Sequence, residues 1–421
     1  MEKTSLHNFF SYKYQAGLIH DAQMLDHSYE NAIVEYGKIF IANLIKCFEE
    51  EKEKGAETYL YRNVKYVLDS IKRDSSQRRI IIDAEPSDLK NVSIITEMFL
   101  LIKEVYHRWI SCDLSTAIKI LDFILDKKLK ITNNPGFTLP KTCVLYRGRV
   151  AETQLDKADL FHIPFMQAYK IRNQRFSITG QPILYLTDSI YGIFNELSTH
   201  EKDEYEKLYI TQYRLKSDTA AWFDKVFDLT INAEDLEQAI DLDEFVSAFY
   251  KFILSCVCSF PNVRGRDRSF FVEEYVLPQL VTQLLKKAGF KGVRYNTVNY
   301  TWHNTDDSQN IEYINYAFFT QKDRADDSID INLRSKFIID SPITVLEVDD
   351  YSTLSNYSEC DIIGKINNHF HRINELMLIM NQIEGSGYYD YYNDEKDYFF
   401  KDGRYRYIDI KTINESGDDD R

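Results

Sequence analysis

The sequence predicts an α+β protein in which an N-terminal all-α helical bundle precedes a domain built on a mixed sheet. Residues 21–130 carry apolar side chains at intervals of three and four and hold one proline, Pro86, as amphipathic helices do. After residue 142 the apolar runs become short and rich in β-branched and aromatic residues, which is typical of strands. Because these runs are unequally spaced and do not alternate strictly with helices, a mixed sheet is favoured over a doubly wound one.

The helical pattern is clearest in residues 32–57, 95–110 and 114–130. In the first of these, one apolar stripe contains Ile33, Tyr36, Ile39, Phe40, Leu44 and Phe48. We therefore expect a bundle of four or five helices over residues 1–132. Residues 131–142, "ITNNPGFTLPKT", concentrate asparagine, proline and glycine, which marks a domain boundary.

The strand-like runs predict a second domain over residues 133–345. They are residues 143–150, 182–187, 208–215, 292–297, 316–320 and 337–348. Residues 270–277, "FFVEEYVL", predict a further strand before a helix that opens at Pro278, so Glu273 and Glu274 would face opposite ways. Residues 346–421 predict a C-terminal helix over 360–385, a hairpin in the tyrosine-rich stretch 388–407, and an acidic tail.

Composition excludes several classes of protein. The 421 residues exceed a usual single domain, and 44% hydrophobic residues are ample for a core. A net charge of −15 argues against a nucleic-acid partner, because binding to phosphate backbones needs a broad basic surface. The N-terminus lacks the apolar core of a signal peptide, and no apolar run approaches the roughly 18 residues of a membrane span. We therefore expect a cytoplasmic protein with no membrane partner.

The usual motifs of metal and nucleotide sites are missing from the sequence. The cysteines are scattered apart from Cys256 and Cys258, which have no second pair to complete a zinc site. His369 and His371 are two apart and would point away from each other on a helix. The glycine motifs of Rossmann and P-loop sites do not occur either. We expect no metal.

Residues 174–197, "QRFSITGQPILYLTDSIYGIFNEL", combine a turn, a strand and a helix. Gly180 and Pro182 end the turn, "ILYLT" forms the strand, and Asp188 can cap a helix. The apolar stripe of that helix contains Ile190, Ile193, Phe194 and Leu197. Glu196 lies on its flank, where a half-desolvated carboxylate could stabilise developing positive charge. Spacing alone favours the alternative of a surface glutamate beside a buried leucine.

The run "LYRGRV" also allows two interpretations. Arg147 and Arg149 are two apart on a strand and therefore share one face, as two arginines that grip a pyrophosphate would. The same charges could instead protect a sheet edge from pairing. Spacing does not choose between these two readings.

Four blocks in order resemble the RES domain family of NAD-consuming toxins, whose fold is like that of ADP-ribosyltransferases. They are "LYRGR" (145–149), "FHIPFMQAYKIRNQRFSITGQPILYLTDSIYGIFNEL" (161–197), "EEYVLPQLVTQLLKKAGFKGVRYNT" (273–297) and "NYAFF" (315–319). The resemblance implies that Arg147 and Glu196 are catalytic and that Thr297 takes the place of the family serine. A second departure is Ser177, where the small toxins commonly have asparagine. These two differences bear on the rate of NAD cleavage and on which molecule accepts the ADP-ribose.

The resemblance implies a site for NAD as substrate, with no other cofactor. Tyr146 and Tyr185 would pack on the nicotinamide or its ribose, and Arg147 and Arg175 would hold the pyrophosphate. Gly180 belongs to the same implied binding block. The implied reaction is cleavage of the nicotinamide–ribose bond by hydrolysis or phosphorolysis. Alternatives are transfer of ADP-ribose to a protein, or a non-catalytic NAD- or ADP-ribose-binding regulatory module.

The helical region resembles, more weakly, the HEPN-like domains that precede RES domains in longer bacterial proteins. Catalytic HEPN ribonucleases use an arginine followed within four to six residues by a histidine, and this chain has no such pair; His107 precedes Arg108. We therefore expect the bundle to scaffold, to sense, or to form a homodimer. For a toxin or antiphage effector, the further partner implied is an antitoxin or regulatory protein.

Overall fold

The computed structural model forms two compact units, each described here by itself. Unit 1 contains Met1–Leu139, His162–Tyr185 and Ala220–Asp330, and unit 2 contains Pro140–Phe161, Leu186–Thr219 and Ile331–Arg421. The structure describes residues 5–25, 28–55, 57–73, 93–132, 136–197, 207–216, 225–262, 271–298, 313–323, 328–344, 364–371, 400–401 and 404–405. Segments of the two units alternate along the chain. The boundaries predicted at residues 132 and 345 would instead divide the chain into consecutive domains, and these boundaries stay predictions.

The helices of the N-terminal region belong to unit 1. They are α1 (Ser5–Phe9), α2 (Tyr12–Leu25), α3 (Tyr29–Glu53), α4 (Tyr59–Arg73), α5 (Ile94–Ile110) and α6 (Leu114–Phe123), which a π-helical turn, η2 (Ile124–Lys128), extends. Ser28 and Ser93 cap α3 and α5, since each side chain accepts a hydrogen bond from a backbone N–H three residues on. The predicted N-terminal helices are confirmed, but the described residues form six α-helices where four or five were expected, because helices begin before residue 21.

Eight strands form the predicted mixed sheet. They are β1 (Val144–Val150), β2 (Ile183–Thr187), β3 (Leu208–Leu215), β4 (Val226–Leu229), β5 (Gly292–Asn296), β6 (Ile314–Phe319), β7 (Phe337–Ile339) and β8 (Ile343–Thr344). The strand order is β4-β5-β6-β2-β1-β3-β7, with β8 paired to β3, and β2 contains residues of both units. Strands β4 and β5 are parallel, whereas β5 pairs antiparallel with β6 and β1 with β3. The fold is therefore α+β, as predicted.

Further helices lie between the strands along the chain. Unit 1 contains η3 (Phe165–Lys170), α9 (Glu234–Gln238), α10 (Leu242–Cys258), η5 (Glu273–Tyr275) and α11 (Val276–Lys287). Unit 2 contains α7 (Ile190–Leu197), α12 (Ile331–Arg334) and a helical segment at 364–371, within the helix predicted for 360–385. A two-stranded pairing of β9 (Phe400–Lys401) with β10 (Arg404–Tyr405) lies in the tyrosine-rich stretch. Among the described residues, none of the helices has the length and apolarity to cross a membrane.

The strand predicted for residues 270–277 is wrong. A 3-10 turn, η5, leads directly into α11, which begins two residues before Pro278. A proline is tolerated in the first turn of a helix because the N–H groups there have no partner within the helix. Pro278 therefore marks the first turn of α11 and not its first residue.

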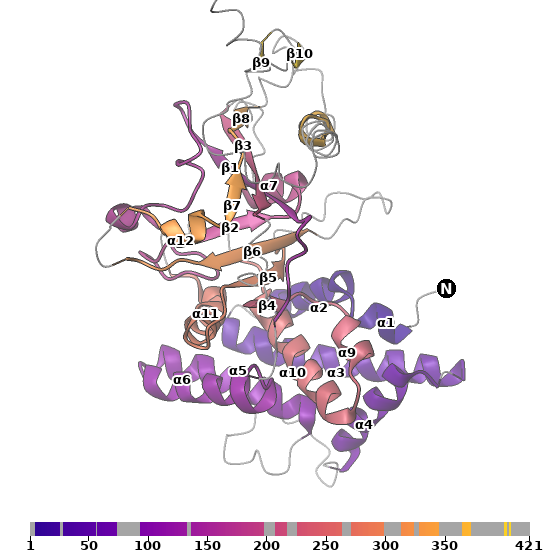
Figure 1. The fold of residues 1–421 in the computed structure, drawn as a ribbon. Coiled ribbons are helices and arrows are strands. Elements are labelled where there is room, and N and C mark those ends of the chain that lie inside the picture. The colour runs from indigo at the N-terminus through magenta and orange to yellow at the C-terminus, as the bar shows by residue number, and fades with distance from the viewer. Residues whose placement is uncertain are drawn as a thin grey trace, which may run out of the picture. The chain divides into compact units, whose positions relative to one another are not determined.

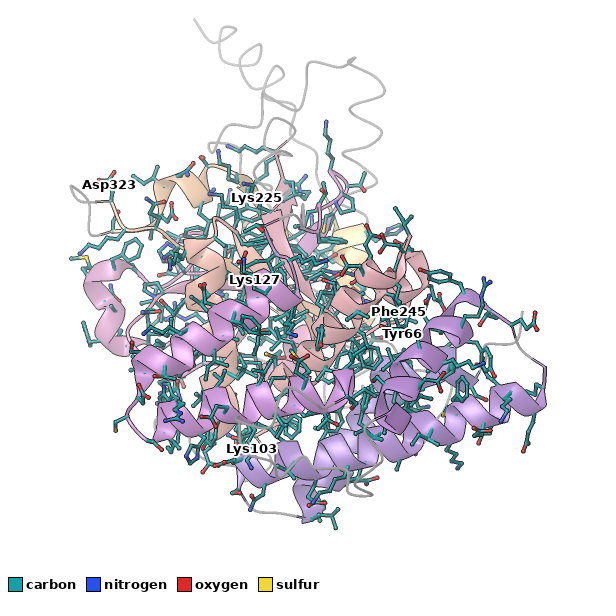
Figure 2. All side chains as sticks on the ribbon, turned by 90° about the horizontal axis from the view of Figure 1, so that it is seen from below. Tyr66, Lys103, Lys127, Lys225, Phe245 and Asp323 are labelled. Atoms are coloured by element: carbon teal, nitrogen blue, oxygen red, sulfur yellow. The ribbon has the colours of Figure 1, made fainter. Side chains whose placement is uncertain are left out.

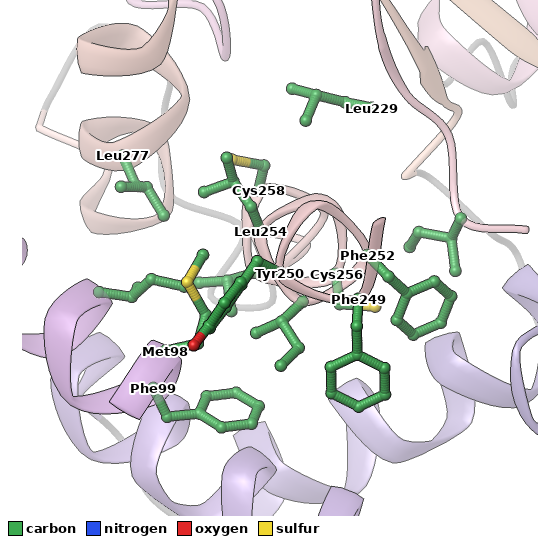
Figure 3. Close-up of a cluster of buried hydrophobic side chains, with 14 of the residues drawn as sticks. Met98, Phe99, Leu229, Phe249, Tyr250, Phe252, Leu254, Cys256, Cys258 and Leu277 are labelled. Atoms are coloured by element: carbon green, nitrogen blue, oxygen red, sulfur yellow. The ribbon is translucent and has the colours of Figure 1, made fainter. Parts of the chain in front are cut away.

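Helix α10 lies at the centre of the core of unit 1. Figure 3 shows Phe249, Phe252 and Tyr250 of α10 directed toward the N-terminal helices, where Phe99 of α5 lies. The ring of Phe249 is 6.2 Å from that of Phe40 on α3. Val293 of β5 belongs to the same hydrophobic cluster. The N-terminal helices, α10 and strands β4 to β6 therefore share one core.

The arrangement of unit 1 follows the polarity of its side chains. Figure 1 shows α9 and α10 beside the N-terminal helices, which are drawn in indigo to purple. Phe245 of α10 is fully buried, whereas the side chain of Lys127 in η2 is exposed. Figure 2 labels both residues. Burial of the apolar faces of these helices is the main stabilising contribution to such a fold.

Unit 2 has a separate and smaller core. It is formed by Ile190, Ile193 and Phe194 of α7, Leu208 and Ile210 of β3, and Ile366 and Phe370. Tyr146 of β1 packs against this cluster. Helix α7 therefore covers the face of the sheet on which Tyr146 lies.

Candidate active site

Two glycines let α7 lie directly on the sheet in unit 2. A Cβ added to Gly148 of β1 would meet Cγ2 of Ile193 at 2.2 Å, and one added to Gly192 of α7 would meet Oγ1 of Thr187 at 2.3 Å. Real Cβ atoms do not approach other heavy atoms so closely. Any side chain at either position would push α7 away from β1 and β2. The two close approaches therefore fix the position of α7.

Glu196 lies on α7 one turn after Gly192. Residues four apart share a face of a helix, so Glu196 projects from the side of α7 that lies against the end of β2. Its side chain is half-buried. Tyr146 is the register partner of Thr187, and paired residues of neighbouring strands point to the same face of a sheet. The structure thus brings Glu196, Thr187 and Tyr146 to one face of unit 2.

Tyr146 provides an aromatic surface on this face. Its ring centroid is 5.5 Å from that of Phe370, and its side chain is half-buried. Burial, with smaller contributions from Asp340 and Cys143, raises the pKa of Tyr146 to about 12. The phenol is therefore neutral at physiological pH and offers a flat surface with a hydroxyl group at its edge.

Arg147 and Arg149 lie on the opposite face of β1. Tyr146 and Gly148 face α7, and successive residues of a strand point to opposite faces, so Arg147 and Arg149 point away from α7. Arg147 is half-buried near Tyr213. Burial raises the pKa of Tyr213 above its usual value, and the positive charge of Arg147 opposes this rise. Nη1 of Arg149 donates to the carbonyl of Asp159 at 2.9 Å. The structure does not bring Arg147 and Glu196 to one face.

Arg175 and Tyr185 belong to unit 1. Nη1 of Arg175 donates to the carbonyls of Cys258 and Phe260, each at 2.9 Å, at the end of α10. Its guanidinium stacks on the ring of Tyr275, with Cζ 5.0 Å from the ring centroid, and the residue is only 9% exposed. These contacts stabilise the C-terminus of α10, where a cation is favourable. Pyrophosphate binding by Arg175 stays a prediction.

A hydrogen-bond network fixes the turn between Arg175 and Tyr185. The hydroxyl of Tyr185 donates to Oγ of Ser177 at 3.3 Å, and Nε2 of Gln279 on α11 donates to the carbonyl of Gln174 at 2.9 Å. Burial raises the pKa of Tyr185 well above its usual value. Gly180 has a φ of +84°, and its N–H donates to the carbonyl of Ile171. The block predicted to bind NAD is thus a rigid turn attached to α11.

Thr297 follows β5 directly in unit 1. The residue is 2% exposed, and its backbone N–H donates to the carbonyl of Tyr313 at 2.9 Å. Its own carbonyl accepts a hydrogen bond from the hydroxyl of Tyr12 on α2. Both neighbouring peptide groups of Thr297 are therefore held in place.

Glu273 and Glu274, expected on a strand, lie in η5. Oε2 of Glu273 accepts a hydrogen bond from the backbone N–H of Tyr29, the first residue of α3, at 3.0 Å. A carboxylate at this position satisfies an N–H group that a helix cannot satisfy itself and interacts favourably with the helix dipole. This contact supports a structural role for Glu273.

The structure adds residues that sequence reasoning missed. Gly148, Gly192 and Thr187 fix α7, and Tyr12 holds Thr297. Each glycine stands in a strand or helix interior, where glycine is unfavourable unless a close approach needs it, and this is the signal that could have found them. Tyr12 gives no such signal, because its partner is 285 residues away. Among the residues that the structure describes, no cluster of histidine, cysteine and carboxylate side chains could hold a metal.

Comparison with known proteins finds a toxin-like relative. The chain is similar to a protein of Bacillus subtilis (strain 168) named "Putative toxin YopC", with 27% identity over 172 residues. The match covers 38% of this chain and 36% of that protein, so it spans about a third of the length of the relative. No family model and no solved structure matches the chain.

The fold and the comparison together define a class. This chain is an α+β protein in which a helical region and a mixed sheet are combined, and it is similar to a toxin-like protein. The similarity to that Bacillus subtilis protein extends over part of each chain.

Proposed function

We propose that this protein is a toxin-like enzyme that cleaves the nicotinamide–ribose bond of NAD. The observation that carries the proposal is the packing of α7 on β1 and β2 through Gly148 and Gly192, which holds Glu196 on the face that carries Tyr146. The order of the four sequence blocks supports it, as does the similarity to a protein named as a toxin.

Glu196 would act on the charge that the reaction develops. When the bond between the ribose C1′ and the nicotinamide nitrogen breaks, the electron pair leaves with nicotinamide, which becomes neutral, and the ribose becomes oxocarbenium-like. A fixed carboxylate stabilises this cation more than it stabilises the bound substrate. An oxygen of water or phosphate then bonds to C1′, and in the case of water its proton passes to solvent.

The other predicted residues enter the proposal with different roles. Tyr146 packs on the nicotinamide or its ribose, because it lies on the same face as Glu196. Thr297 lies in unit 1 and is 2% exposed, so a substrate contact for it stays a prediction from the resemblance. Arg147 leaves β1 on the other face, so in this proposal it supports the strand and does not contact the reacting ribose.

Product analysis tests the proposal. Purified protein is incubated with NAD, with and without phosphate, and nicotinamide, ADP-ribose and its phosphorylated form are quantified. The matched pair is Glu196→Gln and Glu152→Gln, since Glu152 is an exposed glutamate of the same unit that pairs with Lys207. We expect Glu196→Gln to lower nicotinamide release by about 100- to 1000-fold and Glu152→Gln to leave it unchanged.

The alternatives give different outcomes in the same experiment. Nicotinamide release with ADP-ribose recovered on protein would indicate an ADP-ribosyltransferase. NAD binding without release, in wild-type protein and variants alike, would reject catalysis and indicate a binding module. Equal release by the wild type and a folded Glu196→Gln variant would reject the role of Glu196.

A further inference from the structure

We propose that η3 and the turn after it, residues 165–180, form a docking surface for an acidic segment of a partner protein. We call this stretch the η3 surface. Three of its large hydrophobic side chains are exposed: Met166 (66%), Tyr169 (79%) and Ile178 (38%). Exposed apolar side chains that lie together mark interaction sites. The inference does not rest on NAD cleavage, because it concerns binding to a surface that belongs to unit 1 alone.

Helix η3 differs from the other helices of unit 1 because none of its six residues is buried. A helix of a globular protein usually buries an apolar stripe, and this burial stabilises it. In η3, Met166 and Tyr169 lie about one 3-10 turn apart and are instead among the most exposed large hydrophobic residues of the described chain. Packing within unit 1 therefore does not explain these two side chains.

The η3 surface is nevertheless fixed to unit 1. The N–H of Phe165 donates to the carbonyl of Ser328 at 2.8 Å, and the ring centroid of Phe165 is 5.2 Å from that of His162. His162 is 1% exposed, and its Nε2 accepts a hydrogen bond from the N–H of Asp330 at 2.8 Å. Because η3 is ordered before a partner binds, binding does not cost the conformational entropy of ordering it.

The turn after η3 brings Ile178 back toward the helix. The N–H of Gly180 donates at 3.3 Å to the carbonyl of Ile171, the residue that directly follows η3. The N–H of Gln181 donates to the carbonyl of Ile178 at 2.9 Å, which closes the turn further. The closed turn therefore keeps Ile178 and the exposed Arg172 in one short segment next to η3.

The charge of the η3 surface is opposite to that of the chain. Residues 161–182 contain no aspartate and no glutamate, whereas the net charge of the chain is −15. Lys170 and Arg172 are both exposed on this surface. Nζ of Lys170 donates to Oε1 of Gln167 at 2.9 Å and lies 5.8 Å from the ring centroid of Tyr169. Among the described residues Arg172 has no ion-pair partner, so its guanidinium can bind a carboxylate of another molecule.

This combination fits a protein segment that carries carboxylates and a large apolar side chain. Tyrosine, methionine and arginine are residue types that are enriched at protein interfaces. Lys170 and Arg172 would pair with the carboxylates, while Met166 and Tyr169 would pack around the apolar side chain. Charge pairs at the rim of an interface mainly give specificity and speed association, so the apolar contact should contribute most of the affinity.

Charge disfavours two other occupants of the η3 surface. A second copy of the chain, docked through the same surface about a two-fold axis, would bring Lys170 and Arg172 of both copies together. A nucleic acid needs many cations for its phosphates, and two exposed cations on a chain of net charge −15 do not provide them. An acidic protein segment meets neither difficulty.

Peptide display tests the η3 surface directly. A library of random peptides is selected on purified full-length protein, and one enriched peptide is synthesised so that its affinity can be measured by fluorescence anisotropy. We expect enrichment of peptides that combine several acidic residues with a large apolar residue. Added salt should weaken binding of the peptide, because it screens exposed charge pairs. Enrichment of no sequence, or of peptides without acidic residues, would overturn the inference.

Matched variants show where the peptide binds. Tyr169→Ser and Arg172→Glu change the η3 surface, whereas Tyr66→Ser on α4 and Lys119→Glu on α6 change an exposed tyrosine and an exposed lysine elsewhere in unit 1. We expect the first pair to raise the Kd of the peptide at least about tenfold and the second pair to leave it within about twofold. All four side chains are exposed, so each variant should unfold near the wild-type temperature. Equal Kd values for the two pairs would overturn the inference.

The other occupants give different results. A dimer of the full-length protein in sedimentation that Tyr169→Ser dissociates would assign the η3 surface to a second copy of the chain. Binding of an RNA oligonucleotide that Arg172→Glu abolishes would assign it to a nucleic acid. Either result, without an enriched acidic peptide, would overturn the inference. Absence of nicotinamide release would reject the proposed function alone, because peptide binding is measured without NAD.

Discussion

Gly148 lacks a side chain at a point where Ile193 of α7 already occupies the space. This single position connects the sequence to the proposed chemistry, because α7 carries Glu196 and its place on the sheet depends on that contact. Thr187 and Gly192 repeat the same arrangement one strand away. At the scale of residues, the proposed site therefore depends as much on glycines, which leave room for α7 to approach the sheet, as on charged residues.

Gly148→Ala should lower both stability and activity. The added methyl group would meet Cγ2 of Ile193, a methyl group on a β-branched side chain whose χ1 rotamer is restricted, so we expect α7 to shift. We expect a loss of about 1–3 kcal/mol in the free energy of unfolding, measured with urea, and a fall in nicotinamide release. Gly364→Ala is the control, because a Cβ there meets nothing within 4 Å. Normal activity of Gly148→Ala would contradict the proposal that the position of α7 on the sheet depends on Gly148.

Tyr146 should contribute stability that disappears at alkaline pH. Burial raises its pKa to about 12 from an ordinary value of 10.0, so the folded state favours the neutral phenol. The contribution is present in full below pH 10 and is lost as the pH rises toward 12. The stability of Tyr146→Phe should therefore fall less than that of the wild type over this interval, in denaturant unfolding at each pH. If the unfolding free energies of Tyr146→Phe and the wild type fell in parallel over this interval, the burial assigned to Tyr146 would be contradicted.

At the scale of elements, α10 links the helical region to the sheet of unit 1. Its C-terminal carbonyls accept from Arg175, and its aromatic side chains pack against α3 and α5. Arg175 was predicted from family resemblance as a ligand contact, and its contacts in the structure hold this helix end. Arg175 can thus stabilise the fold without contacting a substrate.

Arg175→Met tests that role. Loss of two charge-assisted hydrogen bonds at a buried helix end should cost about 2–4 kcal/mol in the free energy of unfolding. Arg149→Met is matched to it, since Arg149 also donates to a backbone carbonyl but on an exposed surface, and should cost less than about 1 kcal/mol. Similar losses for the two variants would argue against a structural role for Arg175.

The sequence predicted elements where the pattern is local. Strands β1, β2, β3, β5 and β6 follow from their β-branched and aromatic runs, and the helices from their apolar stripes. Strand β4 was missed because "VFDL" is too short to show a period, and its pairing with β5 is a long-range event. Residues 270–277 have strand-like composition, but the helix that contains Pro278 begins before the proline.

The proposed site was predicted only in part, for a physical reason. The face on which Arg147 and Arg149 point follows from strand alternation, and the helix that carries Glu196 follows from its apolar stripe. Which face α7 covers depends on Gly148 and Ile193, which are 45 residues apart. No local pattern encodes such a contact.

At the scale of the whole molecule, each unit has its own core, and the N-terminal helices share theirs with part of the sheet. This arrangement is hard to reconcile with a helical domain that acts only as a removable inhibitor. Removal would expose the apolar side chains of α10 and of strands β4 to β6.

Deletion of residues 1–130 should therefore abolish folding of unit 1 and not activate the enzyme. We expect the truncated protein to be insoluble or to lack a cooperative unfolding transition, as circular dichroism during heating would show. Full-length protein is the comparison. A soluble, cooperatively folded truncation with higher nicotinamide release would indicate autoinhibition by the bundle and would contradict the shared core.

The rate of nicotinamide release from NAD by purified full-length protein, beside Glu196→Gln, tests the central claim most directly. We predict release by the wild type and a loss of about 100- to 1000-fold in a variant that unfolds at the same temperature. Release that is absent from the wild type, or unchanged in the variant, would contradict it.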